Sequence, residues 1–145
     1  MDPIVEELSE SESLSLVAEA GIGRIGFSGR FGPVVLPVTY KMLDGTVVFR
    51  TREGGALSED LRTGIADAHY KVAFEIDEID AASRTGWSVL IQGGARNVED
   101  EAERASVSAA SVEPLVGGER FAYVRITPTR VTGRRIRLPA GRPAS

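Results

Sequence analysis

The sequence predicts a mainly β protein, a six- to seven-stranded antiparallel barrel with peripheral helices. Six or seven short segments alternate apolar and polar residues with the two-residue period of strands that bury one face. Turn residues such as Asp44-Gly45 separate neighbouring segments and favour hairpins over crossover connections. Helical periodicity is confined to the ends and corners, so the chain does not read as a parallel sheet with alternating helices. Closing such strands into a barrel removes their exposed edges.

The amino-terminal segment is expected to form a helix over about residues 10–20. Ser9 and Glu12 have the spacing of a capping box, which satisfies two backbone N–H groups at a helix start. Residues 23–27 then alternate as a first strand, and residues 28–32 are rich in the residues that form turns. The chain therefore leaves its first helix and enters a hairpin.

The second strand is predicted over residues 33–42. It contains Pro37, which has to lie at a bulge or a sheet edge because proline cannot donate to the strand ladder. Asp44-Gly45 is a strong two-residue turn, and residues 46–51 are expected to pair back after it.

The second half of the chain contains further strands and two more helices. Acidic residues at the start of the last helix suit the positive end of the helix dipole. In order, we expect a helix near residues 56–62, strands at 71–76 and 86–98, a helix at about 100–111, and strands at 121–127 and 129–138 with a bend at Pro128.

A single domain is expected over residues 1–138, followed by a flexible tail at residues 139–145. No apolar run approaches the roughly 20 residues of a membrane span, and the acidic amino terminus has the wrong sign for a signal peptide. With a formal net charge of −4 and no RNP-type motif or recognition helix, nucleic acid is not expected as a partner. We expect a cytoplasmic protein with no membrane partner.

The chain has no cysteine and a single histidine, His69. Disulfides, thiolate nucleophiles and metal sites with several imidazoles from one chain are therefore excluded. We expect no metal site, and we nominate no side chain as a catalytic acid or base. An enzyme built from this chain would need carboxylates or a bound cofactor for its difficult step. His69 is interpreted as a surface or cap residue, or alternatively as a haem ligand, since one axial histidine suffices.

Charge is distributed unevenly along the chain. Residues 2–19 contain six acids and no basic residue, whereas residues 120–142 contain seven arginines and no acid. Guanidinium groups bind phosphate and carboxylate through paired hydrogen bonds, so the arginines either line a groove for an anionic substrate tail or form a solvated strand face. The arginines in question are Arg125, Arg130, Arg134, Arg135 and Arg137.

Six segments follow one another in an order typical of a known family: residues 23–27, 35–40, 47–51, 72–77, 84–89 and 124–136. Together they resemble the pyridoxamine 5′-phosphate oxidase-like family, over about residues 10–137. The resemblance implies a split barrel of the FMN-binding type that forms a homodimer, with two cofactor sites at the subunit interface. Members mostly bind FMN, and related branches bind FAD, a deazaflavin coenzyme or haem.

A flavin would supply the redox chemistry that these side chains lack. The resemblance therefore implies a flavin-dependent oxidoreductase that transfers a hydride between the bound flavin and a small organic substrate. The alternative is a non-enzymatic carrier or sequestering protein on the same fold, binding a flavin, FAD, a deazaflavin or haem.

The resemblance also implies a set of cofactor-binding residues. The second strand would lie against the flavin ring, and the end of the third strand would hold the phosphate. Gly55 and Ala56 stand where family members commonly have Ser-Lys, so backbone N–H groups would have to bind the anion there. The implied set is Pro37, Val38, Thr39, Tyr40, Arg50, Thr51, Arg52, Gly55, Ala56, Trp87, Ser88 and Gln92.

Some residues of this set can also be interpreted as packing residues that contact no cofactor. Val38 and Tyr40 share one face of a strand and would then belong to the barrel core. Trp87, the only tryptophan, would be a core or interface anchor. Gln92 lies four residues after Ser88 on the same strand face and is expected to contact a polar edge of the ring.

Overall fold

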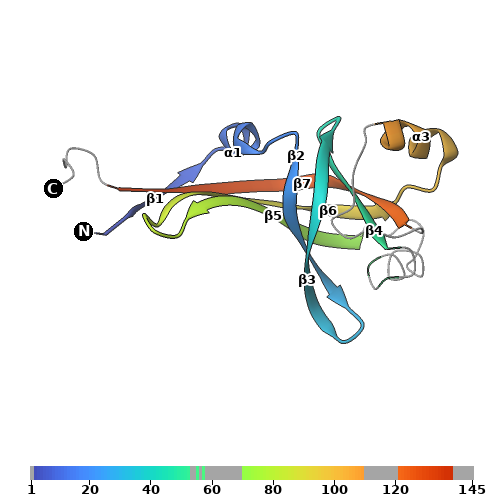
Figure 1. The fold of residues 1–145 in the computed structure, drawn as a ribbon, viewed down its shortest axis with the longest axis horizontal. Helices are drawn as coiled ribbons and strands as arrows, with labels where there is room; N and C mark the ends of the chain where they lie inside the picture. Colours follow the sequence, from blue (N-terminus) through green and yellow to red (C-terminus); the bar gives the residue numbers. More distant parts are fainter. Residues whose placement is uncertain (1, 53–54, 56, 58–69, 110–120, 139–145) are drawn as a thin grey trace.

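The computed structural model describes residues 2–52, 55, 57, 70–109 and 121–138 (Figure 1). The predicted helix near residues 56–62, His69, Ala56 and the tail at 139–145 fall largely or wholly outside these residues. The described elements are β1 (Ile4–Leu8), α1 (Glu10–Leu16), β2 (Ala20–Gly29), β3 (Gly32–Leu43), β4 (Thr46–Arg52), β5 (Tyr70–Asp80), β6 (Thr85–Asn97), α3 (Glu101–Ala109) and β7 (Phe121–Arg137).

The strands form one antiparallel ring. Their order is β1-β7-β4-β3-β2-β5-β6, and a further pairing of β7 with β6 closes the ring. One edge of β7 is shared, because β4 pairs with residues 121–126 and β1 with residues 133–137. The ring is thus a split barrel, as the sequence predicts.

The β2–β3 hairpin is long, and only its base is held in the ring. Its strands pair continuously from Ala20–Lys41 to Gly29–Gly32. By contrast, β2 pairs with β5 only over Arg24–Gly26, and β3 pairs with β4 only from Tyr40 to Leu43. The tip therefore projects from the barrel as an arm, with one divergence between β3 and β4 and another between β2 and β5 (Figure 1).

The main core fills the inside of the ring. Phe74 lies at its centre, with the Tyr40 ring edge-on at 5.5 Å and the Phe49 ring stacked at 6.0 Å between centroids. A second, smaller core lies between α3 and the sheet and contains Val48 and Tyr123. Consecutive residues of β4 are consequently buried on both faces of the sheet, which explains its unbroken run of apolar residues.

Each described helix is held by polar contacts that the sequence indicates. The capping box of α1 is confirmed: the Ser9 hydroxyl accepts from the Glu12 N–H, and the Glu12 carboxylate accepts from the Ser9 N–H, each at 3.1 Å. These bonds lower the pKa of Glu12. On α3, Glu103 accepts hydrogen bonds from Arg96 at 2.6 and 2.7 Å and from Arg125 at 2.8 Å. Glu103 thereby ties α3 to β6 and β7.

Several predicted boundaries are wrong. The first helix ends at Leu16 rather than near residue 20, because the chain turns extended at Val17 and enters β2. The strand predicted at 71–76 is longer than expected, since β5 continues to Asp80 along β6. The strand β1 was not predicted at all. Its five residues pair with the far end of β7, so no local feature announces it.

Pro37 of β3 and Pro128 of β7 lie where the backbone tolerates a proline. The Met42 N–H donates to the Glu19 carbonyl at 2.7 Å, on the β2 side of β3. The backbone N–H and C=O groups of even-numbered β3 residues therefore point toward β2, and the backbone of odd-numbered residues, including Pro37, faces the other edge. That edge has no strand pairing at Pro37, which is the predicted edge position. Pro128 pairs with Gly93 while Arg130 pairs with Gln92, leaving Thr129 as the extra residue of a bulge and confirming the predicted bend.

Candidate functional site

The divergence of β3 from β4 gathers the largest part of the predicted site. The two strands pair as far as Tyr40 and Phe49 and then separate. Pro37 and Thr39 lie on the β3 side of this divergence, and Arg50 on the β4 side. Two stretches that are ten or more residues apart in sequence thus flank one place in the fold.

Val38 and Tyr40 direct their side chains into the core. They are 8% and 3% exposed, and the Tyr40 hydroxyl donates to the Ala18 carbonyl at 3.1 Å. Burial raises the pKa of Tyr40, so its hydroxyl stays protonated and available for that bond. Contacts from these two residues to a ligand would therefore come from their backbone.

The guanidinium of Arg50 stacks on an aromatic ring. Its central carbon lies 3.4 Å from the centroid of Phe121 and 6.0 Å from that of Tyr123. Arg104 of α3 approaches the same rings, at 5.5 and 5.3 Å respectively. We call these four residues the arginine–aromatic cluster. Sequence reasoning found Arg50 but missed Arg104, because only the docking of α3 brings Arg104 there.

The residues that follow Arg50 continue toward the same end of the barrel. Thr51 is half-buried and pairs with Ala122, whereas Arg52 is exposed and pairs with Phe121. The Gly55 N–H donates to the Arg52 carbonyl at 3.0 Å. A third guanidinium therefore lies next to the arginine–aromatic cluster along β4.

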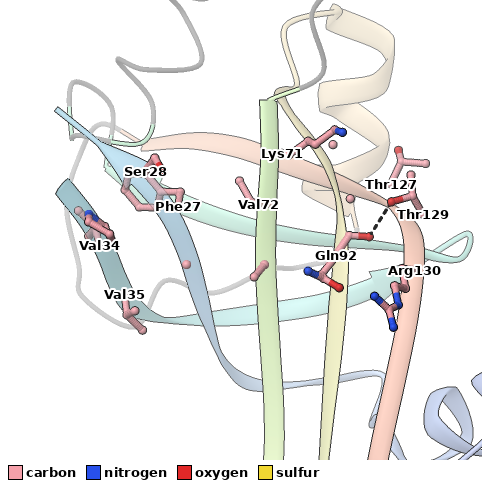
Figure 2. A pocket seen from close by; sticks show the side chains of 15 residues that line it. Phe27, Ser28, Val34, Val35, Lys71, Val72, Gln92, Thr127, Thr129 and Arg130 are labelled. Atoms are coloured by element: carbon pink, nitrogen blue, oxygen red, sulfur yellow. Dashed lines mark hydrogen bonds between the residues drawn. The ribbon is translucent and has the colours of Figure 1, made fainter.

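A groove opens on the other side of the hairpin, where β2 diverges from β5. It has a volume of about 720 Å³ and lies between the hairpin and strands β5 to β7 (Figure 2). The Tyr70 hydroxyl donates to the Ser28 carbonyl across the divergence. Of the predicted site residues only Gln92 lines this groove, and Figure 2 shows its amide beside the Arg130 guanidinium.

The lining of the groove is apolar with a polar rim. Glycine, alanine and valine supply much of its surface, and the cations Lys71 and Arg130 belong to its rim. None of its described lining residues is an aspartate, glutamate or histidine. The groove thus offers hydrogen-bond donors and positive charge but no ordinary proton-transfer group.

Trp87 and Ser88 lie elsewhere in the protomer. Trp87 packs against the main core, and Ser88 lies between Asp77 of β5 and Arg134 of β7. Five residues of strand, about 17 Å, separate Trp87 from Gln92. The strand β6 that carries Trp87, Ser88 and Gln92 pairs with neither β3 nor β4.

The arginines of β7 do not line one groove. Arg125 pairs with Glu103 at 2.8 Å, and Arg137 pairs with Glu6 of β1 at 3.1 Å. Arg130 and Arg134 are exposed on the outer face of the sheet. The structure therefore divides these side chains among ion pairs, the groove, which Arg130 lines, and a solvated face.

Two carboxylates share the outer face of β5 with an arginine. Arg24 of β2 lies 3.5 Å from both Glu75 and Asp77. Burial, helped by a hydrogen bond and charge repulsion from Asp77, raises the pKa of Glu75 to about 7. This face therefore changes charge near neutral pH.

Over the described residues, no three metal-ligating side chains come together, and neither helix has the length and apolarity needed to cross a membrane.

Comparison with known proteins gives consistent matches. A family model described as pyridoxamine 5′-phosphate oxidase matches residues 9–135. The chain is 37% identical over 132 residues to an uncharacterised protein of Mycobacterium tuberculosis, covering 91% of this chain and 86% of that protein.

Solved structures of related proteins are also similar to this chain. The FAD binding protein from Mycobacterium smegmatis has 33% identity and a TM-score of 0.71, over 92% of this chain and 100% of that one. A Corynebacterium glutamicum protein, provisionally named a pyridoxamine 5′-phosphate oxidase, has 26% identity and a TM-score of 0.74, over 96% and 98% of the two chains.

Proposed function

The chain belongs to the pyridoxamine 5′-phosphate oxidase family, and from this premise we propose that it is a flavin-dependent oxidoreductase acting on a small organic substrate. The FAD binding relative from Mycobacterium smegmatis supports a flavin as the cofactor. The observation that carries the proposal is the position of Arg50, near the end of β4 and beside the part of β3 that no longer pairs with β4. A bound flavin would supply hydride transfer, which no described side chain provides.

The residues at the β3–β4 divergence fit a flavin phosphate. Arg50 presents a guanidinium whose fixed fork of donors suits a phosphate dianion, and Arg52 adds a second positive charge close by. Stacking on Phe121 holds the Arg50 guanidinium in one orientation, so less freedom is lost when an anion binds. The missing Ser-Lys pair at Gly55 and Ala56 is thereby offset by arginines.

The edge of β3 that faces away from β2 suits the polar side of a flat ring. Odd-numbered residues of this strand turn their backbone groups away from β2, and beyond Tyr40 no β4 residue pairs with them. Pro37 contributes a carbonyl and no donor there. Peptide groups on a strand edge are held rigidly, so they would orient a planar ligand without the entropy cost of ordering side chains.

We further propose that the working unit is a homodimer. The outer face of β5, β6 and β7 has a neutral centre at Leu90, acids on the β5 side and arginines on the β7 side. A two-fold axis parallel to β6 would lay the acids of one protomer over the arginines of the other, whereas an axis across the strands would oppose like charges. The rows are Ala73–Gln92–Arg130, Glu75–Leu90–Thr132 and Asp77–Ser88–Arg134.

Such a dimer would give a role to the predicted residues that lie apart in one protomer. Ser88 and Gln92 are on the outer face of β6, between the acids and the arginines. From there they would reach the cofactor held by the partner subunit. Trp87 packs against the main core of its own protomer and would support that part of β6.

Binding of FMN and FAD to the purified protein tests the cofactor. We expect Arg50→Ala to weaken both flavins by about 10- to 100-fold, because a charge-assisted hydrogen bond contributes about 1.5–3 kcal/mol. Quenching of flavin fluorescence measures the affinity. Arg137→Ala is the matched control, since its ion pair with Glu6 lies at β1. Wild-type protein that binds neither flavin, with no shift in melting temperature, would contradict the proposal.

A carrier or sequestering function is favoured by one observation. The described lining of the groove contains no aspartate, glutamate or histidine to exchange a proton with a substrate. Anaerobic bleaching of the bound flavin by a nicotinamide donor, or by a reduced deazaflavin, separates the two functions. Bleaching followed by reoxidation with an organic acceptor supports the oxidoreductase, and a flavin that no donor reduces supports the carrier.

A further inference from the structure

The arginine–aromatic cluster contains two guanidiniums from different elements. Arg50 comes from β4 and Arg104 from the first half of α3, and both lie within 5.5 Å of the Phe121 centroid. Each side chain is half-buried rather than extended into solvent. The fold therefore concentrates positive charge where β4, β7 and α3 meet.

Glu103, the residue before Arg104 in α3, neutralises two other arginines by ion pairs. The Glu103 carboxylate forms ion pairs with Arg96 at 2.6 Å and with Arg125 at 2.8 Å, and both arginines lower the pKa of Glu103. Among the described residues, Arg104 has no ion pair of this kind; it donates to the Phe121 carbonyl at 3.5 Å. Most of its five N–H donors are thus not used by that bond.

We propose that Arg104 is a specificity residue that binds a second phosphate, so that the site selects a dinucleotide flavin with a diphosphate over a mononucleotide. This rests on the proposed function, in which Arg50 binds the first phosphate. Both guanidiniums lie near the Phe121 ring, at 3.4 and 5.5 Å from its centroid, and adjacent phosphates of a diphosphate suit two neighbouring guanidiniums. The same chemistry binds inorganic pyrophosphate more tightly than phosphate.

Two variants separate the two phosphates. Arg104→Ala should weaken FAD by about tenfold or more while FMN changes less than about twofold, since only FAD has the second phosphate. Arg50→Ala should weaken both flavins. Arg96→Ala, which removes a β6 arginine that is ion-paired with the neighbouring Glu103, should leave the ratio of the FAD and FMN affinities unchanged. Affinities come from fluorescence titration, and melting temperatures confirm that each variant is folded.

Inorganic pyrophosphate provides a readout without a flavin. By calorimetry, wild-type protein should bind pyrophosphate about tenfold more tightly than phosphate, and Arg104→Ala should abolish this difference. If wild-type protein binds pyrophosphate in this way but no flavin, the proposed function fails and the diphosphate site stands. Equal losses of FAD and FMN in Arg104→Ala, or an unchanged preference between the two anions, would overturn the inference.

Discussion

The fold alters the pKa or the surroundings of individual charged residues in this barrel. Glu75 is the clearest case, since burial and Asp77 raise its pKa to about 7 while Arg24 stands 3.5 Å away. Arg104 is another, because its guanidinium lies against two aromatic rings without an acid beside it in the described structure. Neither property follows from residue type, since both depend on which strand or helix is packed alongside.

The raised pKa of Glu75 makes stability depend on pH. The folded protein holds this proton up to about pH 7 and the unfolded chain only to about 4.5, so stability falls as pH rises through that window. We expect Glu75→Gln to melt at a temperature similar to wild type near pH 4 and higher than wild type above pH 7. Thermal melts across this range measure the difference. Exposed Glu78→Gln is the control, and the same trend there would assign the effect to general charge repulsion.

Elements of the fold are predictable where their features are local. The Ser9 capping box, the Asp44-Gly45 turn and the alternation of β6 all describe contacts within a few residues, and the structure has each of them. The end of α1 and the existence of β1 depend on partners far along the chain, because β1 pairs with residues 133–137. Sequence periodicity contains no information on such pairings.

The bulge between β6 and β7 gives a prediction at this scale. A Cβ atom on Gly93 would lie 2.0 Å from the Thr127 carbonyl oxygen, and backbone would have to shift. We expect Gly93→Ala to destabilise the protein by about 1–3 kcal/mol, as overpacked sites do, which lowers the melting temperature by several degrees. Gly26→Ala is the control, because its Cβ would meet only ordinary contacts at 3.8–3.9 Å. Similar melting of Gly93→Ala and wild type would show that the bulge relaxes.

At the scale of the whole molecule, the sequence predicts the barrel but only part of the candidate site. Pro37, Thr39 and Arg50 do converge, because β3 and β4 are consecutive strands that separate after Tyr40. Ser88 and Gln92 do not join them, since β6 lies across the ring from β3, with β2 and β5 between them on one side and β4 and β7 on the other. A resemblance supplies the residues of such a site without saying which of them belong to one protomer.

The proposed homodimer is tested by exchanging charges across its outer face. Asp77→Arg and Arg134→Asp should each shift the protein toward monomer, because each places like charges together about an axis parallel to β6. The double variant should recover the dimer, since residues 77 and 134 again carry opposite charges, with the two charges exchanged. Sedimentation velocity measures the masses. A wild-type monomer, or a double variant no more dimeric than either single one, would exclude this arrangement.

The β2–β3 hairpin is joined to the ring by three residue pairs on one flank and four on the other, yet it is continuous along its own length. With so few pairs to the neighbouring strands, the hairpin would move as one rigid unit. The arginines proposed to bind phosphate lie beyond one side of this hairpin, and the groove lies beyond the other. Tilting the hairpin to admit a molecule on one side would narrow the space on the other side, so we expect occupancy of one compartment to weaken binding in the other within a protomer.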